Sequence, residues 1–220
     1  MIRVRDLEFS YPKGAFAMRV DELACERGGR IALVGPSGSG KTTLLNLLGG
    51  VLVPQRGSVS VAGEEVSGRP ERWRRAFRLR HVGMIFQAFE LLPYLNVIDN
   101  VLLPAIVDPS LRTPRIRGRA AHLLDSVGLA DKRSRHPALL SQGERQRVAI
   151  CRALVAEPEV VLADEPTGNL DQENARAALA LMLDHVERHG ATFVMSTHNT
   201  SLLDPFERVV DTAALQGAVS

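Results

Sequence analysis

The sequence predicts an α/β protein built on a mostly parallel β-sheet that is covered on both faces. Two observations support this prediction. From residue 141 onward, short apolar runs alternate with amphipathic helical patterns, which is typical of parallel sheets. Nearer the N-terminus, an apolar run at 31–34 leads into a glycine-rich loop and a helix. A chain of 220 residues is long enough to bury the core of such a domain.

The N-terminal third carries strand patterns at 2–9 and 16–23, followed by short apolar pieces around Val59, Val61 and Val66. We interpret this part as an N-terminal antiparallel β subdomain. A basic segment at 69–80 follows and is helical in pattern. It could form a patch for nucleic acid or lipid headgroups, but a solvated helix face is the commoner explanation for such a run.

Residues 35–42 read Gly-Pro-Ser-Gly-Ser-Gly-Lys-Thr and fit the phosphate-binding pattern G-x-x-x-x-G-K-[ST] between a strand at 31–34 and a helix at 43–48. The glycines let successive backbone N–H groups face one anion, and Lys41 adds a point charge for the β- and γ-phosphates. The Thr42 hydroxyl offers an oxygen ligand to Mg²⁺. The chain should therefore bind a nucleoside triphosphate through Gly35, Pro36, Ser37, Gly38, Ser39, Gly40, Lys41, Thr42 and Thr43.

The central part of the chain begins with a buried strand at 82–86 that ends at Gln87. Residues 88–140 read as a helical region that looks like an inserted subdomain and is interrupted by Pro93, Pro104, Pro109, Pro114 and Pro137. The predicted architecture is thus a single domain over 1–220, namely a P-loop NTPase core with its β subdomain (1–87 and 141–220) and a helical subdomain (88–140). The remaining elements are predicted as a helix to 156, a strand at 160–163, a helix at 174–188 and a strand at 192–196.

Three polar residues follow strands that end at the same sheet edge as the phosphate loop. Asp164 and Glu165 follow the strand at 160–163, and His198 follows the strand at 192–196. Asp164 is placed to hold Mg²⁺, Glu165 to orient and deprotonate a water, and His198 to contact the γ-phosphate and that water. The alternatives are a helix-capping carboxylate and a surface histidine. Because Asp164, Glu165 and His198 occur together beside a phosphate loop, the catalytic interpretation is favoured.

Ser141 opens the next helix, and its hydroxyl with the adjacent N–H groups could bind an anion. Taken alone, the segment is an ordinary helix cap.

The composition also limits which functions are possible. The net charge of +2 gives no overall field for nucleic acid, and Cys25 and Cys151 have no metal spacing, which suits a reducing cytosol. The start of the sequence does not resemble a secretory signal, and no apolar stretch approaches membrane-spanning length.

Together these motifs identify a family. The phosphate loop, Gln87, the segments 140–144, 162–165 and 169–171, and His198 resemble ATP-binding-cassette ATPases in order and spacing, over almost the whole chain. Residues 86–93 and 163–171 look most similar to the bacterial branch that serves lipoprotein release, macrolide efflux and a cell-division complex.

The resemblance implies roles that spacing alone does not supply. Tyr11 would stack on adenine, although a strand-end aromatic covering the sheet is an equal alternative. Gln87 would touch Mg²⁺ and the water. Ser141, Gly143 and Glu144 would complete the ATP site of a second, head-to-tail subunit, with Asp171 at the seam.

The family's usual signature is Leu-Ser-Gly-Gly-Gln, whereas this chain has Gln142 in place of a glycine and Glu144 in place of the glutamine. A carboxylate in the first helical turn suits the helix dipole, but it should point away from a γ-phosphate. Ser141 and Gly143 are therefore the firmer part of the comparison.

The resemblance implies an ATP-hydrolysing, Mg²⁺-dependent subunit of a bacterial transporter. It would dimerise with itself or a paralogue beneath a separate integral-membrane permease, on the cytoplasmic face of the membrane, with no nucleic-acid partner. The permease would export, or transmit force to, a lipoprotein, peptide or macrolide. Residues such as Phe89 and Leu92 are either subdomain packing or a groove for the permease. Two alternatives stay open: control of a cell-division or cell-wall complex without transport, and a soluble ATPase switch.

Overall fold

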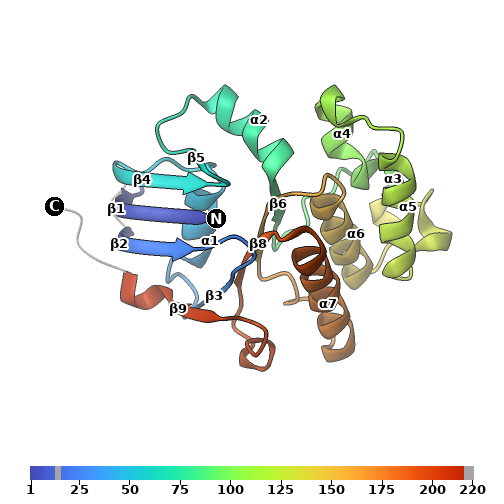
Figure 1. Ribbon diagram of the computed structural model, residues 1–220. Coiled ribbons are helices and arrows are strands. Elements are labelled where there is room, and N and C mark those ends of the chain that lie inside the picture. The colour runs from blue at the N-terminus through green and yellow to red at the C-terminus, as the bar shows by residue number, and fades with distance from the viewer. Residues whose placement is uncertain (13–15, 216–220) are drawn as a thin grey trace.

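The computed structural model describes residues 1–12 and 16–215 and has a mixed α/β fold (Figure 1). An N-terminal antiparallel sheet lies beside a parallel sheet, and a group of helices covers the opposite side. The antiparallel sheet has the order β2-β1-β4-β5. Its strands are β1 (Ile2–Ser10), β2 (Ala17–Cys25), β4 (Arg56–Val61) and β5 (Glu64–Glu65). The predicted antiparallel subdomain is thus confirmed, although β5 precedes Val66 and does not contain it.

The second sheet is parallel and has the order β6-β7-β8-β3-β9. Its strands are β3 (Arg30–Val34), β6 (Val82–Ile85), β7 (Val160–Asp164), β8 (Thr192–Ser196) and β9 (Arg208–Asp211). Successive side chains of its central strands alternate between two cores, as a pleated strand requires. In β7, Leu162 packs toward α1 and the antiparallel sheet, whereas Val161 packs toward the helices. The prediction of a parallel sheet covered on both faces is therefore confirmed.

The longer helices are α1 (Lys41–Leu48), α2 (Glu71–His81), α5 (Ile116–Ser126), α6 (Gln142–Leu154) and α7 (Gln172–His189). The predicted helical region at 88–140 contains α3 (Val97–Val101), α4 (Leu103–Val107) and α5, joined by short turns. Both α3 and α5 pack on α6, which lies against the parallel sheet. The boundaries 88 and 140 stay a prediction, since the core is continuous across α6. Among the described residues, no helix has the length and apolar character needed to span a membrane.

Strand β9 and the start of α1 also differ from the sequence prediction. Strand β9 at the sheet edge is not predicted, because its side chains are mostly exposed and it lacks a long apolar run. Helix α1 begins at Lys41 and not at residue 43, because Gly40 caps it in a left-handed conformation. The phosphate loop therefore passes into the helix without a break, which aims the free N–H groups of the helix start at the loop.

Candidate active site

A cavity of about 550 Å³ opens at the carboxyl edge of the parallel sheet, where β3, β6, β7 and β8 lead into loops. It is lined by Tyr11, Phe16, Gly35, Pro36, Ser37, Gly38, Gly40, Lys41, Thr42, Thr43, Gln87, Asp164, Glu165 and His198. Each of these residues except Phe16 is among those predicted from the sequence. The fold thus brings together side chains from five separate segments at the edge where ligands of parallel sheets collect.

The backbone of the phosphate loop requires glycine at the entry to α1. Gly40 has a φ of 98°, a conformation that other residues rarely adopt. A Cβ atom at this position would also lie 2.5 Å from side-chain atoms of Phe16 and Met18. The strand pair β1–β2 therefore packs directly on the loop and holds its shape.

The side chains of the loop have different roles. The Lys41 ammonium donates to the backbone carbonyls of Gly35 and Pro36, at 2.8 and 3.1 Å, and so curls over the loop. Ser39 is almost fully buried, and its hydroxyl lies 2.6 Å from the hydroxyl of Thr212, in the protein interior. Ser39 does not line the cavity, so its side chain supports the loop from behind.

Tyr11 stands at the wall of the cavity, where 39% of it is exposed. Its ring meets Phe9 edge-on at 4.9 Å and is tilted against Phe16 at 6.1 Å. Its hydroxyl lies 3.2 Å from that of Thr43. Tyr11 thus follows the end of β1 and also lines the cavity, and its stacking on adenine stays a prediction.

A hydrogen-bond network fixes the acidic pair at the end of β7, where Asp164 is the last strand residue and Glu165 follows it. Asp164 accepts the Thr42 hydroxyl at Oδ2 over 2.7 Å and the Ser196 hydroxyl at Oδ1 over 2.6 Å. The backbone N–H of Glu165 donates to the same Ser196 oxygen over 2.9 Å. Ser196 is missed by sequence reasoning, because in the sequence it is only the last residue of a buried strand. Its one signal is its position at the end of β8, beside the end of β7.

Glu165 and His198 both line the cavity, and their side chains are in contact. The imidazole Nδ1 of His198 lies 2.8 Å from Glu165 Oε2. The Glu165 side chain is 12% exposed, whereas that of His198 is 70% exposed. Glu165 also has a φ of 46°, a left-handed conformation that is unfavourable for a residue with a side chain. When Glu165 is ionised it is an acceptor only, so Nδ1 carries the proton and Nε2 can accept one from another group.

The side chains predicted to hold Mg²⁺ present only oxygen ligands. The Thr42 hydroxyl, the Gln87 amide oxygen and the Asp164 carboxylate all belong to the cavity lining. Across residues 1–12 and 16–215, no cluster of three or more His, Cys, Asp or Glu residues could hold a metal. The donor set therefore fits a hard cation that takes few protein ligands and keeps waters and phosphate oxygens, as Mg²⁺ does.

The remaining predicted residues form a second group, which does not line the cavity among the residues that the structure describes. Ser141 caps α6 and Asp171 caps α7. The two caps are neighbours, because the Gln142 amide donates to the Asn169 side chain over 3.2 Å. A Cβ atom on Gly143 would lie 3.1 Å from the Leu170 side chain, so the two segments are closely packed.

The Glu144 carboxylate bonds to groups of its own chain. It forms a capping box with Ser141, whose hydroxyl accepts the Glu144 N–H while the Glu144 carboxylate accepts the Ser141 N–H over 2.7 Å. The same carboxylate pairs with Lys132. The Lys132 contact and the Ser141 N–H lower the pKa of Glu144 below its ordinary value. The charge of the carboxylate therefore has partners inside its own subunit, and its orientation relative to a γ-phosphate stays a prediction.

A parallel sheet that carries a phosphate loop, a strand-end Asp–Glu pair and a histidine at one edge defines a P-loop ATPase of the cassette class. The chain belongs to the ABC transporter family, whose sequence profile matches residues 19–168. Members of this class bind and hydrolyse ATP, and this chain is an ABC ATPase subunit.

The relatives agree with this assignment. The lipoprotein-releasing system ATP-binding protein LolD of Pseudomonas fluorescens is 43% identical over 96% of this chain and 93% of its own length. An uncharacterized ABC transporter ATP-binding protein of Mycobacterium tuberculosis is 40% identical over 99% of this chain and 87% of its own length. The cassette MJ0796, solved as a dimer bound to ADP and Pi, has a TM-score of 0.87 at 29% identity and covers 97% of this chain and 95% of its own.

Proposed function

We propose that this chain hydrolyses ATP at the described cavity with Glu165 as the general base. The loop N–H groups and Lys41 bind the β- and γ-phosphates, and Tyr11 provides a face for the adenine. Glu165 accepts a proton from the attacking water, whose oxygen forms the new bond to the γ-phosphorus as the bond to ADP breaks. ATP and water thus yield ADP and phosphate.

The neighbouring side chains orient this step. His198 holds the Glu165 carboxylate through Nδ1 and presents Nε2 toward the cavity, where it contacts the γ-phosphate and the water. Thr42, Gln87 and Asp164 hold Mg²⁺, which offsets phosphate charge when bound. Gln87 also contacts the water. Asp164 is kept in place by the hydroxyls of Thr42 and Ser196.

The observation that carries this proposal is the Glu165 carboxylate, nearly buried, paired with His198 and set at the strand end beside the phosphate loop. Glu165→Gln should lower ATP turnover by at least about 100-fold while ATP still binds. Glu159→Gln is the matched control, because Glu159 pairs with His81 over the same kind of contact, 2.7 Å, just before the opposite end of β7. Normal turnover in Glu165→Gln would refute the assignment of the base.

We further propose a head-to-tail dimer in which Ser141, Gly143 and Asp171 of one subunit contact the ATP bound to the other. Two facts support it: Ser141 and Asp171 cap helices, and Gly143 lies in the first turn of α6, away from their own cavity, and the similar cassette MJ0796 was solved as a dimer. Light scattering of Glu165→Gln should give 24.0 kDa without ATP and twice that mass with it. Ser141→Arg should stay at the single-chain mass in both conditions. An ATP-independent mass for Glu165→Gln contradicts the proposed dimer.

The partner that we propose is an integral-membrane permease, with the chain held on the inner face of the membrane. The LolD relatives favour a permease that handles lipoproteins over one for peptides or macrolides. Purification of the tagged chain in detergent from its native cells should recover it together with such a permease. Recovery with a division or cell-wall regulator would favour the non-transport alternative, and recovery without any membrane protein would favour a soluble switch.

A further inference from the structure

The segment that follows Gln87 has an unusual backbone. Phe89 and Glu90 are consecutive, neither is glycine, and both have a positive φ, of 61° and 52°. A left-handed residue of this kind is unfavourable for a residue with a side chain and persists only where its surroundings hold it. Something in the fold must therefore fix this turn.

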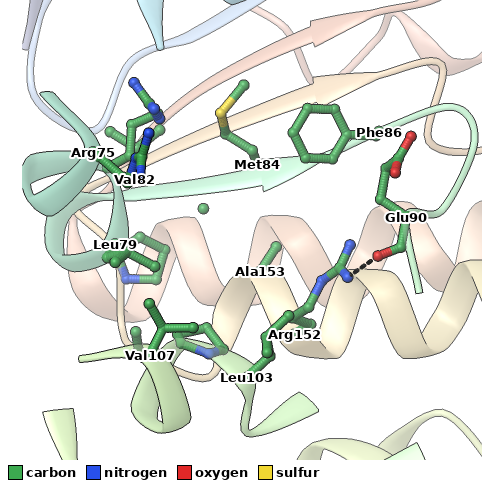
Figure 2. Close-up of a pocket in the computed structure, with 15 residues that line it drawn as sticks. Arg75, Leu79, Val82, Met84, Phe86, Glu90, Leu103, Val107, Arg152 and Ala153 are labelled. Carbon is green, nitrogen blue, oxygen red and sulfur yellow. Dashed lines mark hydrogen bonds between the residues drawn. The ribbon is translucent and has the colours of Figure 1, made fainter. Parts of the chain in front are cut away.

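Arg152 of α6 holds both residues. Its guanidinium donates to the Phe89 carbonyl over 2.6 Å and to the Glu90 carbonyl over 2.5 Å. Figure 2 shows the contact with Glu90. Arg152 is 8% exposed, and burial lowers its pKa below the ordinary value. Arg145, also on α6, lies over the Phe89 ring at 5.9 Å. One helix thus contacts the turn at its backbone and at its aromatic side chain.

The turn also separates two cavities. Gln87 lines the nucleotide cavity, whereas Phe86, Glu90 and Arg152 line a second cavity of about 390 Å³ (Figure 2). The second cavity is mostly apolar and lies between α2, β6, α4 and α6. If the turn changes conformation, the second cavity gives its residues space to move. The same change would displace Gln87, which lines the nucleotide cavity.

We propose that Arg152 is a positioning residue that sets Gln87 in the nucleotide cavity by holding the Phe89–Glu90 turn. This inference rests on the role of Gln87 given under Proposed function. A planar guanidinium can donate to two adjacent carbonyls at once, which a lysine ammonium at the same place does less well. Without Arg152, the two carbonyls lose their buried partner and the turn relaxes to negative φ. Gln87, two residues away, then leaves its position.

The first test is Arg152→Lys, measured by steady-state ATP hydrolysis. We expect kcat to fall about tenfold with KM for ATP unchanged within about twofold, because a misplaced orienting group slows the step without weakening nucleotide binding. Arg119→Lys is the matched control: Arg119, on α5, is a partly buried guanidinium that donates over 3.1 Å to the Leu154 carbonyl at the end of α6, and this carbonyl is not part of the Phe89–Glu90 turn. Its kcat should equal that of the wild type.

The second test is rescue. Glycine adopts a positive φ without a holding partner. Adding Glu90→Gly to Arg152→Lys should restore kcat to within about threefold of the wild type, whereas a merely structural role for Arg152 predicts no recovery. Should Arg152→Lys not fold, Arg152→Gln, which keeps one donor group, is compared with and without Glu90→Gly in the same way.

A double-mutant cycle separates this proposal from the one on which it rests. If Arg152 acts through Gln87, adding Arg152→Lys to Gln87→Ala lowers kcat no further. If the two losses multiply, the Arg152 proposal is overturned while the role of Gln87 stands. If Gln87→Ala alone keeps full kcat, the proposed role of Gln87 fails and the Arg152 proposal fails with it.

Discussion

The hydroxyl of Ser196 donates to Asp164 Oδ1 over 2.6 Å, and the two residues are register partners at the ends of β8 and β7. The same oxygen accepts the backbone N–H of Glu165 over 2.9 Å. One buried hydroxyl therefore fixes both members of the acidic pair, the proposed metal ligand through its side chain and the proposed base through its backbone. The left-handed conformation of Glu165 has this contact as a direct support.

We predict that Ser196→Ala lowers kcat for ATP about tenfold and raises the Mg²⁺ concentration needed for half-maximal turnover, because two buried groups lose a partner at a cost of about 1–3 kcal/mol each. Ser196→Thr keeps the hydroxyl and should stay close to the wild type. The control is Thr192→Val, which removes a buried hydroxyl at the opposite end of the same strand. Equal kcat in Ser196→Ala and Thr192→Val would show that the contact has no catalytic role.

Lys41 provides a second test, of binding and not of turnover. Among residues 1–12 and 16–215, its ammonium bonds to the carbonyls of Gly35 and Pro36, so it is available to exchange them for phosphate oxygens. Lys41→Ala should weaken ATP binding by about 10- to 100-fold, the equivalent of a charge-assisted hydrogen bond. Titration calorimetry measures this, with Lys132→Ala as the control, since Lys132 lies outside the cavity lining. Unchanged heat for Lys41→Ala would remove the phosphate loop from the proposed site.

The parts of the fold that were predictable are those with strong local patterns. Central strands such as β7 are continuous apolar runs, and the phosphate loop has its own fixed motif. Strand β9 was not predictable, because an edge strand with a charged residue at each end buries little and leaves no periodic signal. The start of α1 depends on the left-handed Gly40, which is a property of the folded loop.

The site residues also differ in how far the sequence could predict them. Lys41, Asp164 and Glu165 stand in local motifs, so their gathering in one cavity could be expected. Ser196 could not, because its function depends on the register between two strands far apart in the sequence. Arg152 could not either, since its partners lie more than 60 residues away and are backbone carbonyls with no sequence signal.

The cysteines offer a prediction about reactivity. Cys25 and Cys151 are both buried, and burial raises the pKa of Cys25 to about 11 and that of Cys151 to about 12. The thiolate is the reactive form, so neither residue should react readily at neutral pH. An aromatic disulfide reagent should label neither thiol of the folded protein within minutes and both after unfolding in guanidinium. Rapid labelling of the native protein would show that one thiol is more accessible than this structure has it.

The last prediction concerns Glu144 and pH. The Lys132 pairing and the Ser141 N–H lower its pKa in the folded state, so its carboxylate stabilises the fold above the unfolded pKa of about 4.3 and this contribution is lost as pH falls through the lowered folded value. Glu144→Gln lacks the charge and should be less stable than the wild type by about 1 kcal/mol at pH 7, in the range of a helix cap. Urea unfolding at pH 7 and in acid measures the difference.

That difference should shrink in acid, because both proteins then carry a neutral side chain at 144 and all other titrating groups are shared. Glu187→Gln, an exposed change on α7, is the control and should differ from the wild type by less than about 0.5 kcal/mol at either pH. A gap between wild type and Glu144→Gln that stays constant from pH 7 into acid would mean that the charge of Glu144 does not stabilise the cap. The Lys132 pairing would then be incidental, and the electrostatic compensation of this signature segment would have to come from elsewhere.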